Sequence, residues 1–313
     1  MKDALWQALS SLSLFVLLAI PGWLFSRKKW ISSLQIDGLS TVLVQFIWPV
    51  MVIDAMLQPS VSPQALLRCG TVALYTVLGI ALAAVLAVLM LRWSRTSLVP
   101  GGILVFALMF SNTGLIGMPL MQSLLGDEAL FLTTIAELVN DILIFSVGLV
   151  LMQRSCGTRE PLRLSALLSP GFLGMLLGLF FFLTGIKPPA LLAQALHLIA
   201  GATTPITMFV VGAQVGEQPI RQLLGQKRLY APLLLKLLGI PALVYGILFF
   251  LLGQRDLIAQ VIVLLFAMPS GTCCALFARQ YHGDHQLATG CVTLTTLCSA
   301  LTLPLWMVLC SLK

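Results

Sequence analysis

Two prolines in the middle of long apolar segments mark the part of this chain that is best suited to bind a ligand. Pro119 closes the run Ser-Asn-Thr-Gly-Leu-Ile-Gly-Met-Pro at 111–119, and Pro269 lies in Ala-Met-Pro-Ser-Gly-Thr at 267–272. Each proline predicts a broken helix. In hydrocarbon, the backbone groups freed by a break must be met by protein or by a water-filled cavity. Paired breaks at matched positions therefore predict a binding site deep in a membrane.

The residues around the two breaks suit a carboxylate or another anion. Helix N-termini offer free N–H groups and partial positive charge, and glycines let the backbone approach a ligand closely. We expect the following residues to line the site: Asn112, Thr113, Gly117, Pro119, Asn140, Pro269, Ser270, Gly271 and Thr272. The alternative is that both segments are proline-kinked packing helices with small residues at their contacts.

A second polar group, Glu137, Asn140 and Asp141, lies in another apolar segment. Its spacing of three and four residues puts all three on one helix face. Charges inside membrane spans are costly and are functional hypotheses by default. One of the carboxylates, Glu137 or Asp141, is therefore a candidate carrier of a coupling proton. The alternative is structural, in which they pair with a neighbour such as Lys236 or cap freed backbone.

Two further charges fall within apolar segments. Lys236 lies seven residues into its segment, where its side chain can extend to the membrane interface. Direct contact with a bound anion is its alternative role. Asp54 lies near the end of its segment, where it can reach water.

The elements that must position these residues are membrane helices. Apolar residues make up 59% of the 313 residues and charged residues only 9%, whereas soluble domains contain about 25% charged residues. A span needs about 20 residues. Ten spans are predicted, at 4–25, 31–57, 66–91, 100–123, 127–152, 166–185, 189–215, 229–252, 256–279 and 286–311.

The distribution of charge predicts orientation and argues against nucleic acid as a partner of this chain of net charge +7. If both termini lie outside, the inside loops hold most of the Lys and Arg residues, as membrane topology favours. The first span is followed at once by Arg27, Lys28 and Lys29, so we interpret it as retained rather than as a cleaved signal.

Ten spans divide into two sets of five, and units with an odd number of spans insert in opposite orientations. We expect a first five-helix repeat at 1–152, a cytoplasmic connector at 153–165 and an inverted second repeat at 166–313. Trp48-Pro49 and Thr204-Pro205 are matching landmarks in the two halves.

Catalytic and metal-binding patterns are weak in this sequence. Its seven cysteines lack metal-ligand spacing, and it has no Walker-type loop. His282 and His285 flank Asp284 in what we interpret as a solvated turn rather than a metal site. We therefore expect no enzyme activity, no cofactor and no metal.

Four motifs together resemble the auxin efflux carrier family, whose bacterial branch includes malonate and malate permeases. They are the run at 111–119, Leu-Val-Asn-Asp-Ile-Leu at 138–143, Leu-Leu-Gly-Ile-Pro at 237–241, and Ala-Met-Pro at 267–269 with Phe-Ala-Arg-Gln-Tyr at 277–281. The resemblance covers essentially the whole chain.

The resemblance implies an all-α fold related to that of sodium/proton antiporters and bile-acid symporters, with broken helices 4 and 9 crossing at their prolines. It further implies a homodimer in which spans 1, 2, 6 and 7 form a scaffold, while spans 3–5 and 8–10 move as an elevator. The sequence differs from plant auxin carriers in its short central connector and in having Ser270 where those carriers commonly have Gln. Both differences argue against auxin as the substrate.

The sequence thus predicts a secondary carrier of a small organic anion in a bacterial-type inner membrane, with malonate or malate favoured by analogy and proton or sodium as the coupling ion. Two alternatives remain open. One is a cation/proton exchanger, because Asn140 and Asp141 beside a broken helix also suit a cation. The other is a membrane sensor that keeps the fold without transport.

Overall fold

The computed structural model describes residues 2–95, 98–158, 169–218 and 220–311, and its elements within these ranges are helices. Residues 159–165 of the predicted connector lie outside the described residues. The first half contains α1 (Lys2–Arg27), α2 (Ser33–Val42), η1 (Leu43–Ile47), α3 (Trp48–Leu57), α4 (Pro63–Trp93), α5 (Leu98–Met109), η2 (Thr113–Gly117), α6 (Met118–Leu125), α7 (Asp127–Leu143), η3 (Ile144–Gly148) and α8 (Leu149–Ser155).

The second half has the same all-helical character. It contains α9 (Pro170–Thr184), α10 (Ala190–Gly201), α11 (Thr203–Glu217), α12 (Ile220–Leu224), η5 (Lys227–Leu229), α13 (Tyr230–Leu234), η6 (Leu235–Gly239), α14 (Ile240–Tyr245), η7 (Gly246–Leu251), α15 (Leu257–Ala267), α16 (Cys273–Gln280) and α17 (His285–Ser311). Apart from η5, a 3₁₀ turn, the η elements are π-helical turns: η1, η3 and η6 join two helices into a longer run, η2 begins the run that continues into α6, and η7 ends the run that contains α14.

Six helical runs among the described residues are long and apolar enough to cross a membrane: Ser33–Leu57, Pro63–Trp93, Asp127–Ser155, Ala190–Glu217, Lys227–Leu251 and His285–Ser311. Four shorter apolar helices, Ser13–Arg27, Thr113–Leu125, Pro170–Thr184 and Leu257–Ala267, fall within or beside the other four predicted spans. The expectation of a helical integral membrane protein is therefore confirmed.

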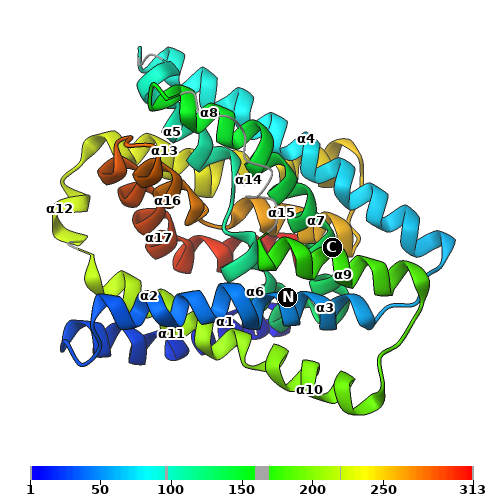
Figure 1. Ribbon diagram of the computed structural model, residues 1–313. Helices are drawn as coiled ribbons and strands as arrows, with labels where there is room; N and C mark the ends of the chain where they lie inside the picture. The colour runs from blue at the N-terminus through cyan, green and yellow to red at the C-terminus, as the bar shows by residue number, and fades with distance from the viewer. Residues whose placement is uncertain (1, 96–97, 159–168, 219, 312–313) are drawn as a thin grey trace.

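The helices lie in two layers (Figure 1). In the view of Figure 1 the lower layer consists of α1, α2, α3, α9, α10 and α11, and the upper layer consists of α4, α5, α7, α8 and α13 to α17, while α6 lies between them and contacts both α1 and α7. The main apolar core lies in the upper layer, where α15 packs against α4, α7 and α17. Helices α1 and α17 form one contact between the layers, and α3 and α7 form another.

Glycines bring the helices of the lower layer into close contact. A Cβ atom at Gly22 of α1 would lie 1.9 Å from the carbonyl oxygen of Phe209 in α11, and one at Gly212 would lie 2.0 Å from that of Ala19. Helices α3 and α9 meet in the same way, because a Cβ at Gly174 would lie 2.8 Å from Pro49. Small residues at such contacts let membrane helices pack backbone to backbone.

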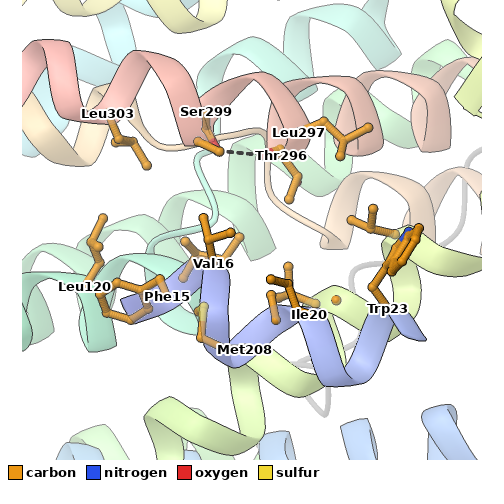
Figure 2. Close-up of a pocket in the computed structure, with 16 residues that line it drawn as sticks. Phe15, Val16, Ile20, Trp23, Leu120, Met208, Thr296, Leu297, Ser299 and Leu303 are labelled. Atoms are coloured by element: carbon orange, nitrogen blue, oxygen red, sulfur yellow. Dashed lines mark hydrogen bonds between the residues drawn. The ribbon is translucent and has the colours of Figure 1, made fainter. Parts of the chain in front are cut away.

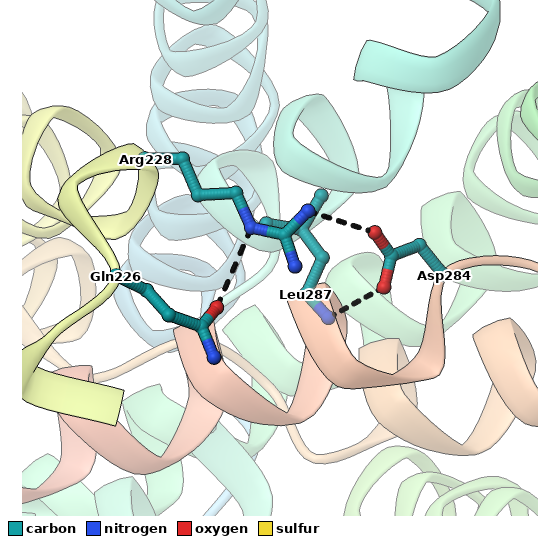
Figure 3. Close-up of polar contacts among 4 residues, drawn as sticks. All are labelled: Gln226, Arg228, Asp284 and Leu287. Carbon is teal, nitrogen blue, oxygen red and sulfur yellow. Dashed lines mark hydrogen bonds and ion pairs between the residues drawn. The ribbon is translucent and has the colours of Figure 1, made fainter. Parts of the chain in front are cut away.

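The turn before α17 holds polar contacts at the edge of the upper layer (Figure 3). Asp284 accepts the N–H of Leu287 at 2.8 Å, which caps the helix, and pairs with Arg228 at 3.1 Å. Arg228 in turn donates to Gln226. Asp284 thus acts as a helix cap and an ion-pair partner in the turn between His282 and His285.

Candidate functional site

The first break in the helices lies at residues 110–112. Helix α5 ends at Met109, and helical structure resumes at Thr113 in η2, which continues into α6. The prediction that Pro119 itself breaks the helix is wrong, because Pro119 lies inside the resumed helix at the start of α6. The π turn just before it, in which the Gly117 N–H reaches back to Asn112, accommodates the proline without a break.

The second break lies at Pro269, as the sequence predicts. Helix α15 ends at Ala267, Met268 is extended with φ −63° and ψ 152°, and α16 begins at Cys273. The break therefore runs from Met268 to Thr272 and includes this proline.

The two breaks pair with each other as a short antiparallel bridge between Ser111 and Ser270. The Asn112 N–H donates to Pro269 O at 2.8 Å, and the Gly271 N–H donates to Phe110 O at 2.9 Å. The Ser270 N–H is met by the hydroxyl of Thr295 at 3.1 Å. Each break thus supplies hydrogen-bond partners for backbone groups that the other break has freed. We call the two paired segments, residues 110–112 and 268–271, the crossing.

Lys236 reaches the crossing from η6 with a side chain that is fully buried. Its Nζ donates to Ser111 Oγ at 2.7 Å and to the carbonyl oxygen of Leu108 at 3.1 Å. The expected extension to the membrane interface is wrong: the ammonium instead satisfies a carbonyl at the C-terminal end of α5, where the helix dipole favours a cation.

Asn112 lies at the crossing, and its side-chain amide is unpaired within the part of the chain that the structure describes. The residue is 6% exposed, and its Nδ2 has no hydrogen-bond partner among the described residues. Buried polar groups are almost always paired, so an unpaired one needs an explanation. Asn112 precedes η2 and makes no side-chain cap bond to it. Its amide is therefore available to a ligand.

Glu137 and Asn140 are brought together with Thr113 beside the crossing. The Thr113 hydroxyl donates to Glu137, and Asn140 Nδ2 donates to Glu137 Oε2 at 3.2 Å. A cavity of about 10 Å³, the size for one water molecule, lies among Ser111, Thr113 and Asn140. Glu137 does not pair with Lys236 in the described structure, whose ion pairs involve other residues.

Trp48 covers this carboxylate from the lower layer. A Cβ at Gly114 would lie 2.6 Å from Glu137 Oε1 and 3.1 Å from Cζ2 of Trp48. The indole ring and the carboxylate therefore meet at Gly114, where only a hydrogen atom fits. The indole Nε1 is buried and has no partner among the described residues.

The other predicted site residues are at or near the crossing, with two exceptions. Ser270 and Gly271 belong to the crossing itself, Thr272 precedes α16, and Gly117 packs under the carbonyl of Asn112. Pro119 is buried in α6, away from the break. Asp141 is half-buried and forms no hydrogen bond or ion pair with the described residues, but it lies one turn after Glu137 on α7, close enough for the charges of the two carboxylates to repel each other.

Three residues that contribute to the site are absent from the site residues predicted from the sequence: Ser111, Trp48 and Thr295. Ser111 belongs to the quoted motif, and its place before Asn112 was an available signal. Trp48 was noted only as a landmark, and Thr295 is one of several threonines in its helix. Their contacts arise from tertiary packing, which spacing does not reveal.

Asp54 does not reach water freely as expected. It is 8% exposed and lies 3.1 Å from His197 Nδ1, which joins α3 to α10 within the lower layer. This contact is separate from the crossing.

A helical bundle with several membrane-capable helices and a buried polar crossing is typical of membrane transporters. A family model described as "Membrane transport protein" matches residues 9–307. The chain therefore belongs to this family, and the resemblance to the auxin efflux carriers is confirmed. The family is one of transporters rather than enzymes.

Two relatives agree with this membership. An "Uncharacterized transporter" of Methanothermobacter thermautotrophicus is 29% identical over 63% of this chain and 64% of its own length. A "Putative malonate transporter" of Rhizobium meliloti is 25% identical over 63% of each chain. The matches thus span somewhat less than two thirds of the relatives.

Proposed function

We propose that this transporter carries a small organic anion with one or two carboxylates by alternating access. The observation that supports this most is Lys236, a cation buried at the crossing that forms none of the ion pairs between described residues. A buried positive charge without a close acidic partner favours an incoming anion and disfavours a cation at the same place.

The anion binds where Asn112 and the two half-helix starts converge. The amide Nδ2 of Asn112 supplies a hydrogen bond that the described residues leave unused. The N-termini of η2 and α16 add partial positive charge beside it. Thr113, Gly117, Pro269, Ser270, Gly271 and Thr272 shape the site around these donors, and Pro119 holds the second half-helix in place.

Malonate or malate is the substrate class that we favour. The relative from Rhizobium meliloti bears a malonate name, and a compact dicarboxylate matches a site built from one amide and backbone N–H groups. The side chains at the crossing are short and form hydrogen bonds. They would therefore select a substrate by its charge and size rather than by contact with an apolar surface.

Proton coupling fits the opposed charges at the crossing. Glu137 contacts Thr113, and Lys236 contacts Ser111, which lies two residues before Thr113 in the chain. When Glu137 takes up a proton, its negative charge no longer repels an anion that approaches Lys236, and the site becomes more attractive to that anion. Anion and proton would then bind together and cross together. Asp141 is the second candidate for this role.

The larger architecture belongs to the same proposal. Helix α1 packs on α11 and α3 packs on α9 through glycines, as expected if the second half repeats the first with inverted orientation. The lower layer contains predicted spans 1, 2, 6 and 7, and would serve as the scaffold of a homodimer. The upper layer would move as the elevator. Both termini would lie outside a bacterial-type inner membrane.

Replacing Asn112 with alanine is expected to lower uptake of labelled malonate or malate into proteoliposomes by about 10-fold to 100-fold, since a hydrogen bond to a charged group contributes about 1.5–3 kcal/mol. The measurement compares this variant with Gln260→Ala, a half-buried amide of α15 away from the crossing, which should transport normally. Uptake that is equal in both variants would remove Asn112 from the site. Absence of anion flux in folded wild-type protein would favour the cation exchanger or the sensor.

Replacing Glu137 with glutamine is expected to abolish the stimulation of uptake by an imposed pH gradient and to retain binding of the anion. Glutamine keeps the size of the side chain and its contacts with Thr113 and Asn140 but cannot carry the proton. Asp141→Asn is the matched variant. If only Asp141→Asn removes the stimulation, the coupling role moves to Asp141; if neither does, the carrier is not coupled to protons.

A further inference from the structure

An apolar cavity of about 240 Å³ lies between the two layers, separate from the crossing. Helices α1 and α11 form one wall, and the η2–α6 segment and α17 form the other (Figure 2). Val16 and Ile20 on α1 are 49% and 47% exposed. The cavity is therefore open along its side, toward the surface that faces lipid in a membrane protein.

The chemistry of the cavity excludes a hydrophilic ligand. Its polar side chains are Trp23, Thr296 and Ser299, and the rest of the lining is apolar. Ser299 is already satisfied, because its hydroxyl donates to the carbonyl oxygen of Thr296 at 2.7 Å (Figure 2). A malonate-like anion would find no charge partner in the cavity. A hydrocarbon chain would fill the cavity and form van der Waals contacts with its apolar lining, which favours binding.

The position of the cavity along α1 matches the depth of one lipid leaflet. At 1.5 Å per residue, Trp23 lies about 6 Å and Phe15 about 18 Å from Arg27 along the helix. One leaflet contributes about half of a hydrocarbon core of roughly 30 Å. The cavity therefore runs from just below the charged end of α1 to the depth at which an acyl chain ends.

The charge at this end of α1 is positive. Arg27, Lys28 and Lys29 are exposed one turn beyond Trp23, and we call them the basic cluster. Lys28 lies 4.8 Å from the ring of Trp30. The neighbouring end of α11 carries one acidic residue, Glu217, next to Gly216, which packs against α1. The basic cluster and Glu217 together have a positive net charge, which complements the negative charge of a phosphate headgroup.

We propose that this cavity is a binding site for one acyl chain of an anionic phospholipid whose headgroup lies at the basic cluster. The chain would contact Ile20 and Met208 on one wall and Leu120 and Leu303 on the other. A lipid in this place fills the space between the two layers, so its presence would affect any movement of one against the other. The binding itself does not depend on the proposed substrate or coupling.

The test measures the lipid that the protein retains. Wild-type protein is reconstituted in vesicles of equal parts phosphatidylglycerol and phosphatidylcholine with identical acyl chains, extracted in mild detergent, and analysed by native mass spectrometry. We expect retained phosphatidylglycerol in excess over phosphatidylcholine. Ala300→Phe, which fills the cavity from α17, should lower retained phospholipid by about tenfold, whereas Leu301→Phe, 80% exposed and outside the lining, should not.

The same experiment also tests whether the basic cluster binds the lipid headgroup. Arg27→Gln with Lys29→Gln should lower the preference for phosphatidylglycerol by about fivefold for each charge and leave chain binding in place. Arg92→Gln, an exposed arginine at the end of α4, is the control.

Three results would overturn the proposal. They are equal lipid retention by Ala300→Phe and wild type, no headgroup preference in wild type, and a change of oligomeric state with Ala300→Phe, which would make a second copy of the chain the occupant. If Ala300→Phe does not fold, Ile20→Trp fills the cavity from the opposite wall. A loss of lipid with normal uptake would leave the proposed function intact.

Discussion

Replacing Lys236 with methionine is expected to reduce anion uptake below about 1% of the wild-type rate, since two effects combine. The variant removes the buried positive charge that favours the anion. It also leaves the Leu108 carbonyl and the Ser111 hydroxyl without their partner, at a cost of about 1–3 kcal/mol for each buried group. The second effect loosens the crossing on which the site depends.

Thermal unfolding in detergent distinguishes these effects. We expect Lys236→Met to remain folded with a lower Tm, and Lys227→Met, an exposed lysine at the start of the same helical run, to behave as wild type. Lys236→Arg keeps the charge but overfills the site, so it should recover stability only in part. Normal uptake by Lys236→Met would contradict the anion site at the crossing.

Adding a single methyl group at Gly212 is expected to cost about 3 kcal/mol of stability or more. The Cβ of Gly212→Ala would lie 2.0 Å from the Ala19 carbonyl oxygen. This atom belongs to helix backbone, so it cannot move aside as a flexible side chain could. Helices α1 and α11 must separate along their length to admit the methyl.

The measurement is the Tm of the purified protein, with an expected drop of about 5–10 °C for Gly212→Ala. Gly201→Ala is the matched control, because a Cβ at Gly201 meets nothing within 4 Å. It should leave Tm unchanged. Equal Tm values for the two variants would show that the glycine contact between α1 and α11 is not needed.

The sequence predicted the presence of two breaks but misplaced one of them. Pro119, Pro49 and Pro241 are each preceded by a π turn that ends two residues earlier, at Gly117, Ile47 and Gly239. A π turn shifts the hydrogen-bond pattern, so the missing N–H of proline is absorbed within a continuous helix. Proline alone therefore does not distinguish a break from a widened turn, and of these three prolines and Pro269, it is Pro269 that lies in a break.

In the predicted site, likewise, the contacts set by local helix spacing could be predicted, whereas those set by tertiary packing could not. Glu137 and Asn140 were placed on one face by helix periodicity, and the structure joins them through Thr113. The position of Lys236 was not predictable in this way. A long side chain seven residues into a span can point to the interface or to the interior, and the choice depends on the end of α5, a distant part of the chain.

The crossing also has a consequence for biogenesis. The Asn112 N–H and the Phe110 carbonyl receive their partners from Pro269 and Gly271, in the other half of the chain. Before the second half of the chain has been synthesised, these groups lack these partners, and each unsatisfied group costs several kcal/mol in hydrocarbon. The break in the first half therefore reaches its final structure late, after the second half has been inserted into the membrane.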